Sequence, residues 1–561
     1  MFTRGVTLIG CSRRVPKGIN GRRLVSSRVA PHGVKSSNWK VPSISAVLLS
    51  AAALSWFSNP GPLALDTQTQ GVTVEELQKH TSPDSVWVAI NGKVYDLTEF
   101  LTRHPGGAGI ILKYAGKNAS VIFNKFHAPN FVDKYLTPEE CLGPLIGELE
   151  PAQDITEVGD SELRQEYIDN MPPLSEVFRV SDFEYIAKKI LPPSAWYYYS
   201  SAADDEVSLR ENHNAFSRIF FNPRVLVDVS NVDLSTTLMG SPASVPFYSS
   251  ATAQGKLGHP DGECSIARGC GKEGVIQMIS NYSSFPLADI VGAAQKGQPQ
   301  WFQLYHEGEP NSKQLVSECE ELGLKAIFVT VDTPELGRRE KDMKLRAQIE
   351  ANSDSSEDSS GAQELQSAVS YGKDTSVTWK DVENIASWTT IPVAVKGVQS
   401  VEDVVLAAEK GVKAVVISNH GGRQLDYARA PVEVLADAMP VLKEKGLDGK
   451  IDIFVDGGVR RGSDIIKCLA LGAKGVGLGR VFLYANSCYG EEGVRKAIEL
   501  LKSEMILDMK LLGVTKISDL GPQHLDLRGL HARLPPNDNL YYENYEPLSP
   551  PTFQHERSER R

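Results

Sequence analysis

The chain has 561 residues, of which 41% are hydrophobic and 23% charged, the balance of a globular protein long enough for two or more domains. Its formal net charge of −11 disfavours nucleic acid as a partner. The seven cysteines are scattered, odd in number and without metal-ligand spacing, which argues against a disulfide scaffold and against a zinc site.

Residues 1–65 differ in kind from the rest of the chain. They contain nine Lys or Arg and no acidic residue, the pattern of a mitochondrial transit peptide. The apolar run Ile44–Phe57 is shorter than the ~20 residues that span a bilayer. We expect a presequence in two parts, the second of which sorts the protein to the mitochondrial intermembrane space; a secretory signal is the alternative. Removal of these residues would leave a more acidic protein that attracts a basic soluble partner.

Residues 71–148 predict a compact first module. Val86–Ile90 and Lys93–Leu97 flank Asn91-Gly92, a strong hairpin signal. His104, in His-Pro-Gly-Gly, and His127 follow. Two imidazoles on opposite faces of a planar macrocycle would hold a haem iron and leave no open position for dioxygen. A simple turn would explain His-Pro-Gly-Gly alone.

The sequence before that motif, Trp-Val-Ala-Ile-Asn-Gly-Lys-Val-Tyr-Asp-Leu-Thr-Glu-Phe, is similar to the cytochrome b5 family. The resemblance implies a haem b with His104 and His127 as its axial ligands. Residues 149–175 are acidic and polar and end in Pro172-Pro173, so we expect a mobile linker.

Residues 176–530 alternate short apolar strands with helical segments, which predicts a (β/α)8 TIM barrel. A polar insertion near 346–375 cannot bury a core, and we expect it to be disordered. The tail 531–561 forms no domain and is expected to wrap over a neighbouring subunit. The eight strands are expected to centre on Phe247, Gln277, Phe302, Phe328, Val395, Val416, Phe454 and Val476.

The central motif is Ser418–Asp426, which follows the buried strand expected from the β-branched run before it. His420 and Arg423 would therefore stand where a strand ends, the usual place of barrel active sites. An imidazole can take a proton from a small acid while a guanidinium binds its carboxylate through two hydrogen bonds. A packed turn is the alternative for this histidine.

Glycine-rich turns at two further strand ends predict a phosphate site. Asp456-Gly457-Gly458-Val459-Arg460 follows the seventh strand and Gly477-Leu478-Gly479-Arg480 the eighth. Exposed backbone N–H groups and two arginines suit the phosphate of flavin mononucleotide (FMN). Asp332, after the fourth strand, could fix the tautomer of His420, or could merely cap a loop. Lys396, on the fifth strand, would face the charge that reduced flavin carries near N1.

Residues 71–545 as a whole resemble the FMN-dependent α-hydroxy-acid oxidase and dehydrogenase family, whose signature is Ser-Asn-His-Gly-Gly-Arg-Gln. The resemblance implies that His420 is the base, Asp332 its partner and Arg423 the carboxylate clamp. Arg339 would assist Arg423, Tyr305 would bond the substrate hydroxyl, and Tyr198 the carboxylate. Flavin contacts would fall on Ala251, Thr252, Ser280, Gln303, Thr330, Lys396, Asp456, Gly457, Gly458, Arg460, Gly479 and Arg480.

The chain departs from the family pattern at three places: Ala202-Ala203, Val481 and Tyr282. Tyr282 replaces an aliphatic residue or a tryptophan of relatives, and we expect it to restrict the side chain of the substrate.

The resemblance implies oxidation of a short L-2-hydroxy acid, best L-lactate, with electrons passing from FMN through haem b to cytochrome c, in a homotetramer. His420 could remove either the α-proton or the hydroxyl proton. The alternatives are a glycolate-type oxidase that uses dioxygen, and a haem electron carrier with an inactive barrel.

Overall fold

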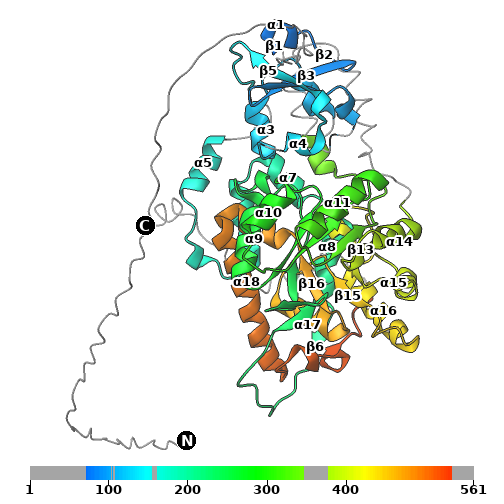
Figure 1. Ribbon diagram of the computed structural model, residues 1–561. Coiled ribbons are helices and arrows are strands. Elements are labelled where there is room, and N and C mark those ends of the chain that lie inside the picture. Colours follow the sequence, from blue (N-terminus) through cyan, green and yellow to red (C-terminus); the bar gives the residue numbers. More distant parts are fainter. Residues whose placement is uncertain are drawn as a thin grey trace, which may run out of the picture. The chain divides into compact units, whose positions relative to one another are not determined.

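The computed structural model describes residues 71–532 except 103, 105–107, 130, 154–160 and 346–376 (Figure 1). The predicted presequence 1–65, the predicted insertion 346–375 and the tail beyond residue 532 lie outside the described residues. Within the described part, no helix is both long and apolar enough to cross a membrane.

The first module is built on a five-stranded sheet with the order β1-β5-β4-β3-β2. The predicted hairpin is confirmed, because β3 and β4 pair antiparallel around Asn91-Gly92. Both turn residues have positive φ, 51° and 81°, as a tight turn between twisted strands requires. The strands are Val72–Thr73 (β1), Thr81–Ser82 (β2), Ser85–Ile90 (β3), Lys93–Asp96 (β4) and Cys141–Ile146 (β5). The helices are Val74–Leu77 (α1), Glu99–Thr102 (η1), Ala108–Lys113 (α2), Ser120–Phe126 (α3), Val132–Tyr135 (α4) and Pro138–Glu140 (η2).

The segment predicted as a linker contains a helix that we did not expect, α5 (Ser161–Asp169). None of its residues is buried, and its contact with the core of the second module is limited to residues such as the half-buried Tyr167. A hydrogen bond from Gln165 Nε2 to Asp169 Oδ1 (2.8 Å), one helical turn apart, supports it locally. The mobility of the segment stays a prediction.

The second module is a closed barrel of eight parallel strands in the order β9 to β16, which confirms the predicted (β/α)8 fold. Each predicted strand centre lies inside an observed strand. The strands are Phe247–Ser249 (β9), Ile276–Ser280 (β10), Gln300–Leu304 (β11), Ile327–Thr330 (β12), Val393–Val398 (β13), Ala414–Ile417 (β14), Asp452–Val455 (β15) and Gly475–Leu478 (β16).

Large side chains fill the centre of the barrel. Trp301 is buried there, with ring centroids 5.0 Å from Tyr248, 5.1 Å from Phe328 and 5.6 Å from Phe454. Neighbouring strand residues such as Phe302 and Val329 point outward and pack against the surrounding helices. This alternation makes the barrel a solid support, so that chemistry is confined to its ends.

Helices surround the strands, with α14, α15 and α16 along one flank and α9 beside α18 on another (Figure 1). They are Leu174–Glu176 (η3), Val180–Ile190 (α6), Pro193–Ser200 (α7), Val207–Ser217 (α8), Gly255–Leu257 (η4), Gly262–Lys272 (α9), Leu287–Ala293 (α10), Glu309–Glu321 (α11), Trp379–Ser387 (α14), Val401–Glu409 (α15), His420–Gly422 (η5), Pro431–Glu444 (α16), Gly462–Leu471 (α17), Arg480–Leu512 (α18), Ile517–Asp519 (η6) and Pro522–His524 (η7). Two small antiparallel ribbons complete the module: Phe220–Phe221 (β6) with Leu525–Asp526 (β17), and Thr236–Leu238 (β7) with Ser241–Ala243 (β8).

Candidate active site

The base predicted from the sequence lies just beyond the carboxyl end of β14, in the short turn η5. His420 has φ = 57°, a left-handed conformation rare for a residue with a side chain, and its N–H donates to Ser418 Oγ (3.0 Å). Its ring Nδ1 is 3.0 Å from Asp332 Oδ1, which comes from the loop after β12. The structure therefore forms the His–Asp pair that we expected, and the other ring nitrogen is left to the cavity, which His420 lines.

The electrostatics of this pair suit a base. Burial lowers the pKa of His420 below its ordinary value, although Asp332 opposes the shift. Burial alone would raise the pKa of Asp332, but His420 and Lys396 hold it below its ordinary value. At neutral pH the imidazole is therefore neutral and its partner charged, so the pair is suited to accept a proton, and the carboxylate would stabilise the resulting imidazolium.

Two arginines converge on the same cavity, which both line. Arg423 Nη1 donates to the backbone carbonyls of Tyr198 (2.6 Å) and Ser201 (3.1 Å), and its guanidinium lies 5.2 Å from the centre of the Tyr198 ring. Burial and the nearby Arg339 lower the pKa of Arg423 to about 9. Two close cations in a buried place are relieved by an anion, and a carboxylate matches the fork of a guanidinium.

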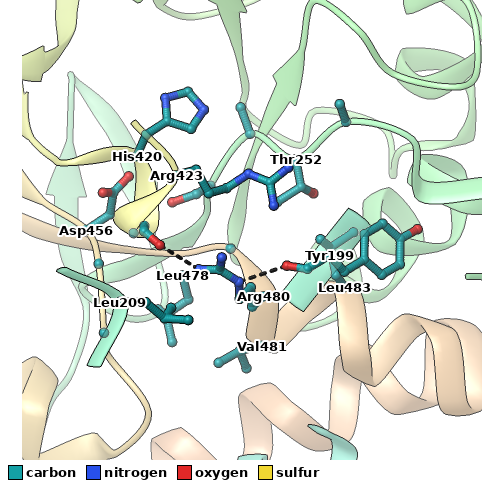
Figure 2. Close-up of a pocket in the computed structure, with 18 of the residues that line it drawn as sticks. Tyr199, Leu209, Thr252, His420, Arg423, Asp456, Leu478, Arg480, Val481 and Leu483 are labelled. Atoms are coloured by element: carbon teal, nitrogen blue, oxygen red, sulfur yellow. Dashed lines mark hydrogen bonds between the residues drawn. The ribbon is translucent and has the colours of Figure 1, made fainter. Parts of the chain in front are cut away.

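The two arginines predicted at the phosphate turns make different contacts. Arg480 donates to the backbone carbonyl of Tyr199 (2.8 Å; Figure 2) and to those of Gly421 (2.9 Å) and Ser201 (3.0 Å). It therefore also joins α7 to the turn η5, which holds His420. Arg460 pairs with Glu184 of α6, with Nη1 3.0 Å from Oε2. Sequence reasoning missed both sets of partners.

A single large cavity brings the predicted residues together. Its empty volume, open solvent at the mouth included, is about 1560 Å³, room for a flavin nucleotide and a small acid side by side. Every predicted barrel residue lines it except Asp332 and Thr330, which lie behind the wall. Thr330 Oγ1 accepts from Gln303 Nε2 (2.9 Å), and Gln303 Oε1 accepts from Ser280 Oγ (3.2 Å). The lining residues to which the sequence gave us no reason to assign a role include Glu184, His213, Gln424 and Tyr484.

Tyr282 forms part of the wall beside the predicted substrate residues. Its ring stacks on that of Tyr305, with centroids 5.0 Å apart and planes 24° from parallel. Its hydroxyl donates to Glu307, a residue that we had not singled out. Burial and the Glu307 carboxylate raise the pKa of Tyr282, so the phenol stays protonated and its ring is held in one orientation.

The cavity fits FMN. Ser250 Oγ and Asp456 Oδ1 both line it, are buried and have no hydrogen-bond partner among the described residues, as expected of groups that bond a ligand. The glycine-rich turns after β15 and β16 supply backbone N–H groups on the same wall, next to Arg460.

The first module fits a haem held by two histidines. The rings of His104 and His127 have centroids 6.4 Å apart and planes 72° from parallel. Two metal–nitrogen bonds of about 2 Å, with the radii of both rings, give a separation of roughly 6 Å, so one iron fits between them. Burial lowers the pKa of His127 to about 3, which keeps the imidazole neutral, as ligation requires. Aromatic side chains flank both histidines: the Phe100 ring centroid lies 5.8 Å from that of His104, and the Phe123 ring centroid 5.0 Å from that of His127.

A barrel cavity with a His–Asp pair, two arginines and room for a flavin, in one chain with a module that brings two histidines together, is the arrangement of an oxidoreductase that uses a flavin and a haem. Comparison with known proteins gives the family. Residues 187–527 match the model for FMN-dependent dehydrogenases, and residues 73–146 match the cytochrome b5-like haem/steroid-binding domain. The chain belongs to the FMN-dependent dehydrogenase family, and its cofactors are FMN and haem b.

Three individual proteins of known identity are similar to this chain. It is 50% identical to an L-lactate dehydrogenase (cytochrome) of Wickerhamomyces anomalus over 98% of both chains. It is 41% identical to glycolate oxidase 3 of Arabidopsis thaliana, over 62% of this chain and 96% of the relative. Among solved structures, the recombinant flavin-binding domain of baker's yeast flavocytochrome b2 is 52% identical with a TM-score of 0.63, and the match covers 69% of this chain and 96% of that domain.

Proposed function

We propose that the protein oxidises a short L-2-hydroxy acid, L-lactate to pyruvate, and passes the electrons through its haem to cytochrome c. The observation that carries this proposal is the base His420, bonded to Asp332 and facing Arg423 and Arg339 across one flavin cavity. The bis-histidine module of the same chain gives the electrons a route onward.

Binding of the substrate follows from the charges of the cavity. The carboxylate would lie between Arg423 and Arg339, which relieves the repulsion of the two guanidiniums. Tyr198, whose ring is covered by the guanidinium of Arg423, would complete this subsite. The substrate side chain would then pack on the Tyr282 ring, which has no room to turn because it is stacked and hydrogen-bonded.

The proton moves to His420. With the carboxylate clamped, the α-carbon and its hydroxyl face the free ring nitrogen of His420, which takes the α-proton or the hydroxyl proton while Asp332 stabilises the imidazolium. Tyr305 would donate to the substrate hydroxyl oxygen, and Lys396 would offset negative charge on the cofactor. FMN, when bound, accepts the two electrons of the oxidation, and the haem takes electrons singly. The remaining predicted flavin contacts would hold the cofactor in place.

Relatives of both kinds bear on the choice between a dehydrogenase and a dioxygen-using oxidase. The glycolate oxidase matches about 62% of the chain, whereas the L-lactate dehydrogenase (cytochrome) matches 98% of it. His104 and His127 lie in residues 73–146, the cytochrome b5-like domain, and a match over 98% of the chain takes in both that domain and the barrel. A one-electron exit through haem therefore supports the dehydrogenase over the oxidase, and the His420–Asp332 pair at the flavin cavity supports it over a carrier with an inactive barrel.

We propose further that residues 1–65 direct the protein to the mitochondrial intermembrane space, where the acidic mature chain meets basic cytochrome c. The functional units would then be a haem domain at 71–148, a linker at 149–175 and a flavin barrel at 176–530, assembled as a homotetramer whose tails, 531–561, cover neighbouring subunits. Sizing of the mature protein and fractionation of mitochondria test these statements.

Stopped-flow mixing of the oxidised holoenzyme with L-lactate tests the central proposal. Flavin bleaching should be followed by reduction of the haem, and then of added cytochrome c. His420→Gln should abolish flavin bleaching while FMN stays bound; His259→Gln, a change of the same chemistry away from the cavity lining, should not. Flavin bleaching without haem reduction would favour the oxidase, and full activity of His420→Gln would refute the base.

A further inference from the structure

Arg339 stands on a loop, not on a strand, and the structure shows how that loop is held. It follows β12 and carries Arg339 to the cavity opposite Arg423. If a loop becomes ordered only when its guanidinium binds a carboxylate, the entropy lost by the loop weakens binding. A loop that is already ordered avoids this cost.

One end of this loop is fastened by Gln424, a buried neighbour of Arg423 with 7% of its surface exposed. The Gln424 amide nitrogen donates to the carbonyls of Asp332 (2.8 Å) and Glu335 (2.7 Å), and its oxygen accepts from the Gly337 N–H (3.2 Å). Three hydrogen bonds thus join the residue after the carboxylate clamp to the loop that carries the second arginine.

The backbones of the two loops are also in close contact. A Cβ atom placed on Gly337 would lie 2.3 Å from the Arg423 carbonyl oxygen, so only glycine permits this approach. The hydrogen bonds of Gln424 therefore fix the distance between the loop that carries Arg339 and the turn that carries Arg423.

The other end of the loop is fastened by Glu206, which is also buried. Glu206 Oε1 accepts from the Ala202 N–H (3.0 Å), and its second oxygen accepts from Lys341. Close by, the Asp204 N–H donates to the Arg338 carbonyl (2.9 Å). Arg339 thus lies between two fastenings, one to the loop of Arg423 and one to the start of α8.

We propose that Gln424, with the Glu206–Lys341 pair in support, is a positioning residue that sets the spacing of Arg339 and Arg423 for one carboxylate. The inference rests on the proposed function, since it assumes that a substrate carboxylate binds between these arginines. Gln424 also lines the cavity, but its amide nitrogen and its oxygen both bond the backbone of the loop, so we assign its effect to the position of Arg339. Loss of its hydrogen bonds should weaken carboxylate binding and leave the base and the flavin site intact.

A double-mutant cycle on the holoenzyme tests this, with oxalate as an unreactive carboxylate probe and its Kd read from the perturbation of flavin absorbance. Gln424→Met keeps the length of the side chain and removes its hydrogen bonds. It should raise the oxalate Kd and the KM for L-lactate about tenfold. This is roughly the contribution of one hydrogen bond between Arg339 and the carboxylate, which a misplaced Arg339 would lose. In an Arg339→Met background the same change should raise the Kd less than twofold. The Kd for FMN should stay within twofold of the original.

Equal effects of Gln424→Met in both backgrounds would overturn the proposal, because they would show a general structural role. So would an oxalate Kd that Gln424→Met leaves unchanged. If Gln424→Met does not fold, Lys341→Met, a change at a half-exposed site, serves in the same cycle and should raise the Kd two- to threefold only when Arg339 is present. Because oxalate binding needs no turnover, a wild-type enzyme that binds oxalate but does not oxidise L-lactate would refute the proposed substrate and leave this cycle to decide the role of Gln424.

Discussion

Replacement of Asp332 by Asn isolates what the carboxylate adds to the base. The change keeps the shape of the side chain and an oxygen that can accept from His420 Nδ1, which lies 3.0 Å from Asp332 Oδ1. It removes the charge that, on the proposed mechanism, would stabilise the imidazolium of His420. Since the Asp332 side chain is fully buried and that of His420 is 24% exposed, water screens this interaction only weakly.

A hydrogen bond to a charged group contributes about 1.5–3 kcal/mol, and each 1.36 kcal/mol changes a rate tenfold, so flavin reduction should slow roughly 10- to 150-fold. The assay is the rate of flavin bleaching after stopped-flow mixing with saturating L-lactate. The Kd for FMN should not change. Asp452→Asn, at the other end of the barrel, is the matched control and should keep the original rate. An undiminished rate in Asp332→Asn would show that the carboxylate is only a loop cap.

Three further outcomes are expected. As pH falls, kcat/KM should decrease with a midpoint below pH 6.5, because the lowered pKa of His420 keeps its imidazole neutral down to that pH. Asp332→Asn should move the midpoint to still lower pH, since the Asp332 carboxylate raises the pKa of His420. Tyr282→Leu should favour longer 2-hydroxy acids over L-lactate by about tenfold in kcat/KM, measured on a substrate panel, because it opens the stacked wall. His127→Ala should lose haem absorbance and cytochrome c reduction but keep flavin bleaching by L-lactate, and loss of flavin bleaching in this variant would contradict separate sites.

The barrel could be predicted from sequence because its strands are short apolar runs of buried, β-branched residues, a pattern that depends on nearby residues alone. His420 and Arg423 could be placed because a strand end fixes where its next residues stand. By contrast, α5 escaped prediction because an exposed polar helix has no apolar stripe to reveal it. Gln424 is part of the signature motif, but its hydrogen-bond partners lie about 90 residues earlier in the chain. A local sequence pattern does not predict a hydrogen bond over that separation.

The same reason explains the partners of the arginines. Arg480 was expected at a phosphate, and the structure adds three backbone carbonyls from segments far earlier in the chain. The pairing of Arg460 with Glu184 joins residues more than 270 positions apart. Charge and position along a strand predict that a side chain reaches the mouth of the barrel, but not which groups it meets there.

The left-handed backbone conformation of His420 lowers the stability of the folded protein in exchange for the position of its imidazole. Holding a residue with a side chain at φ = 57° costs about 1 kcal/mol or more, and Asn or Gly would fit there with less strain. A lineage that no longer needed a proton acceptor at this place would gain resistance to unfolding by discarding the imidazole. The imidazole at this backbone position is therefore explained by its chemistry and not by the stability of the turn.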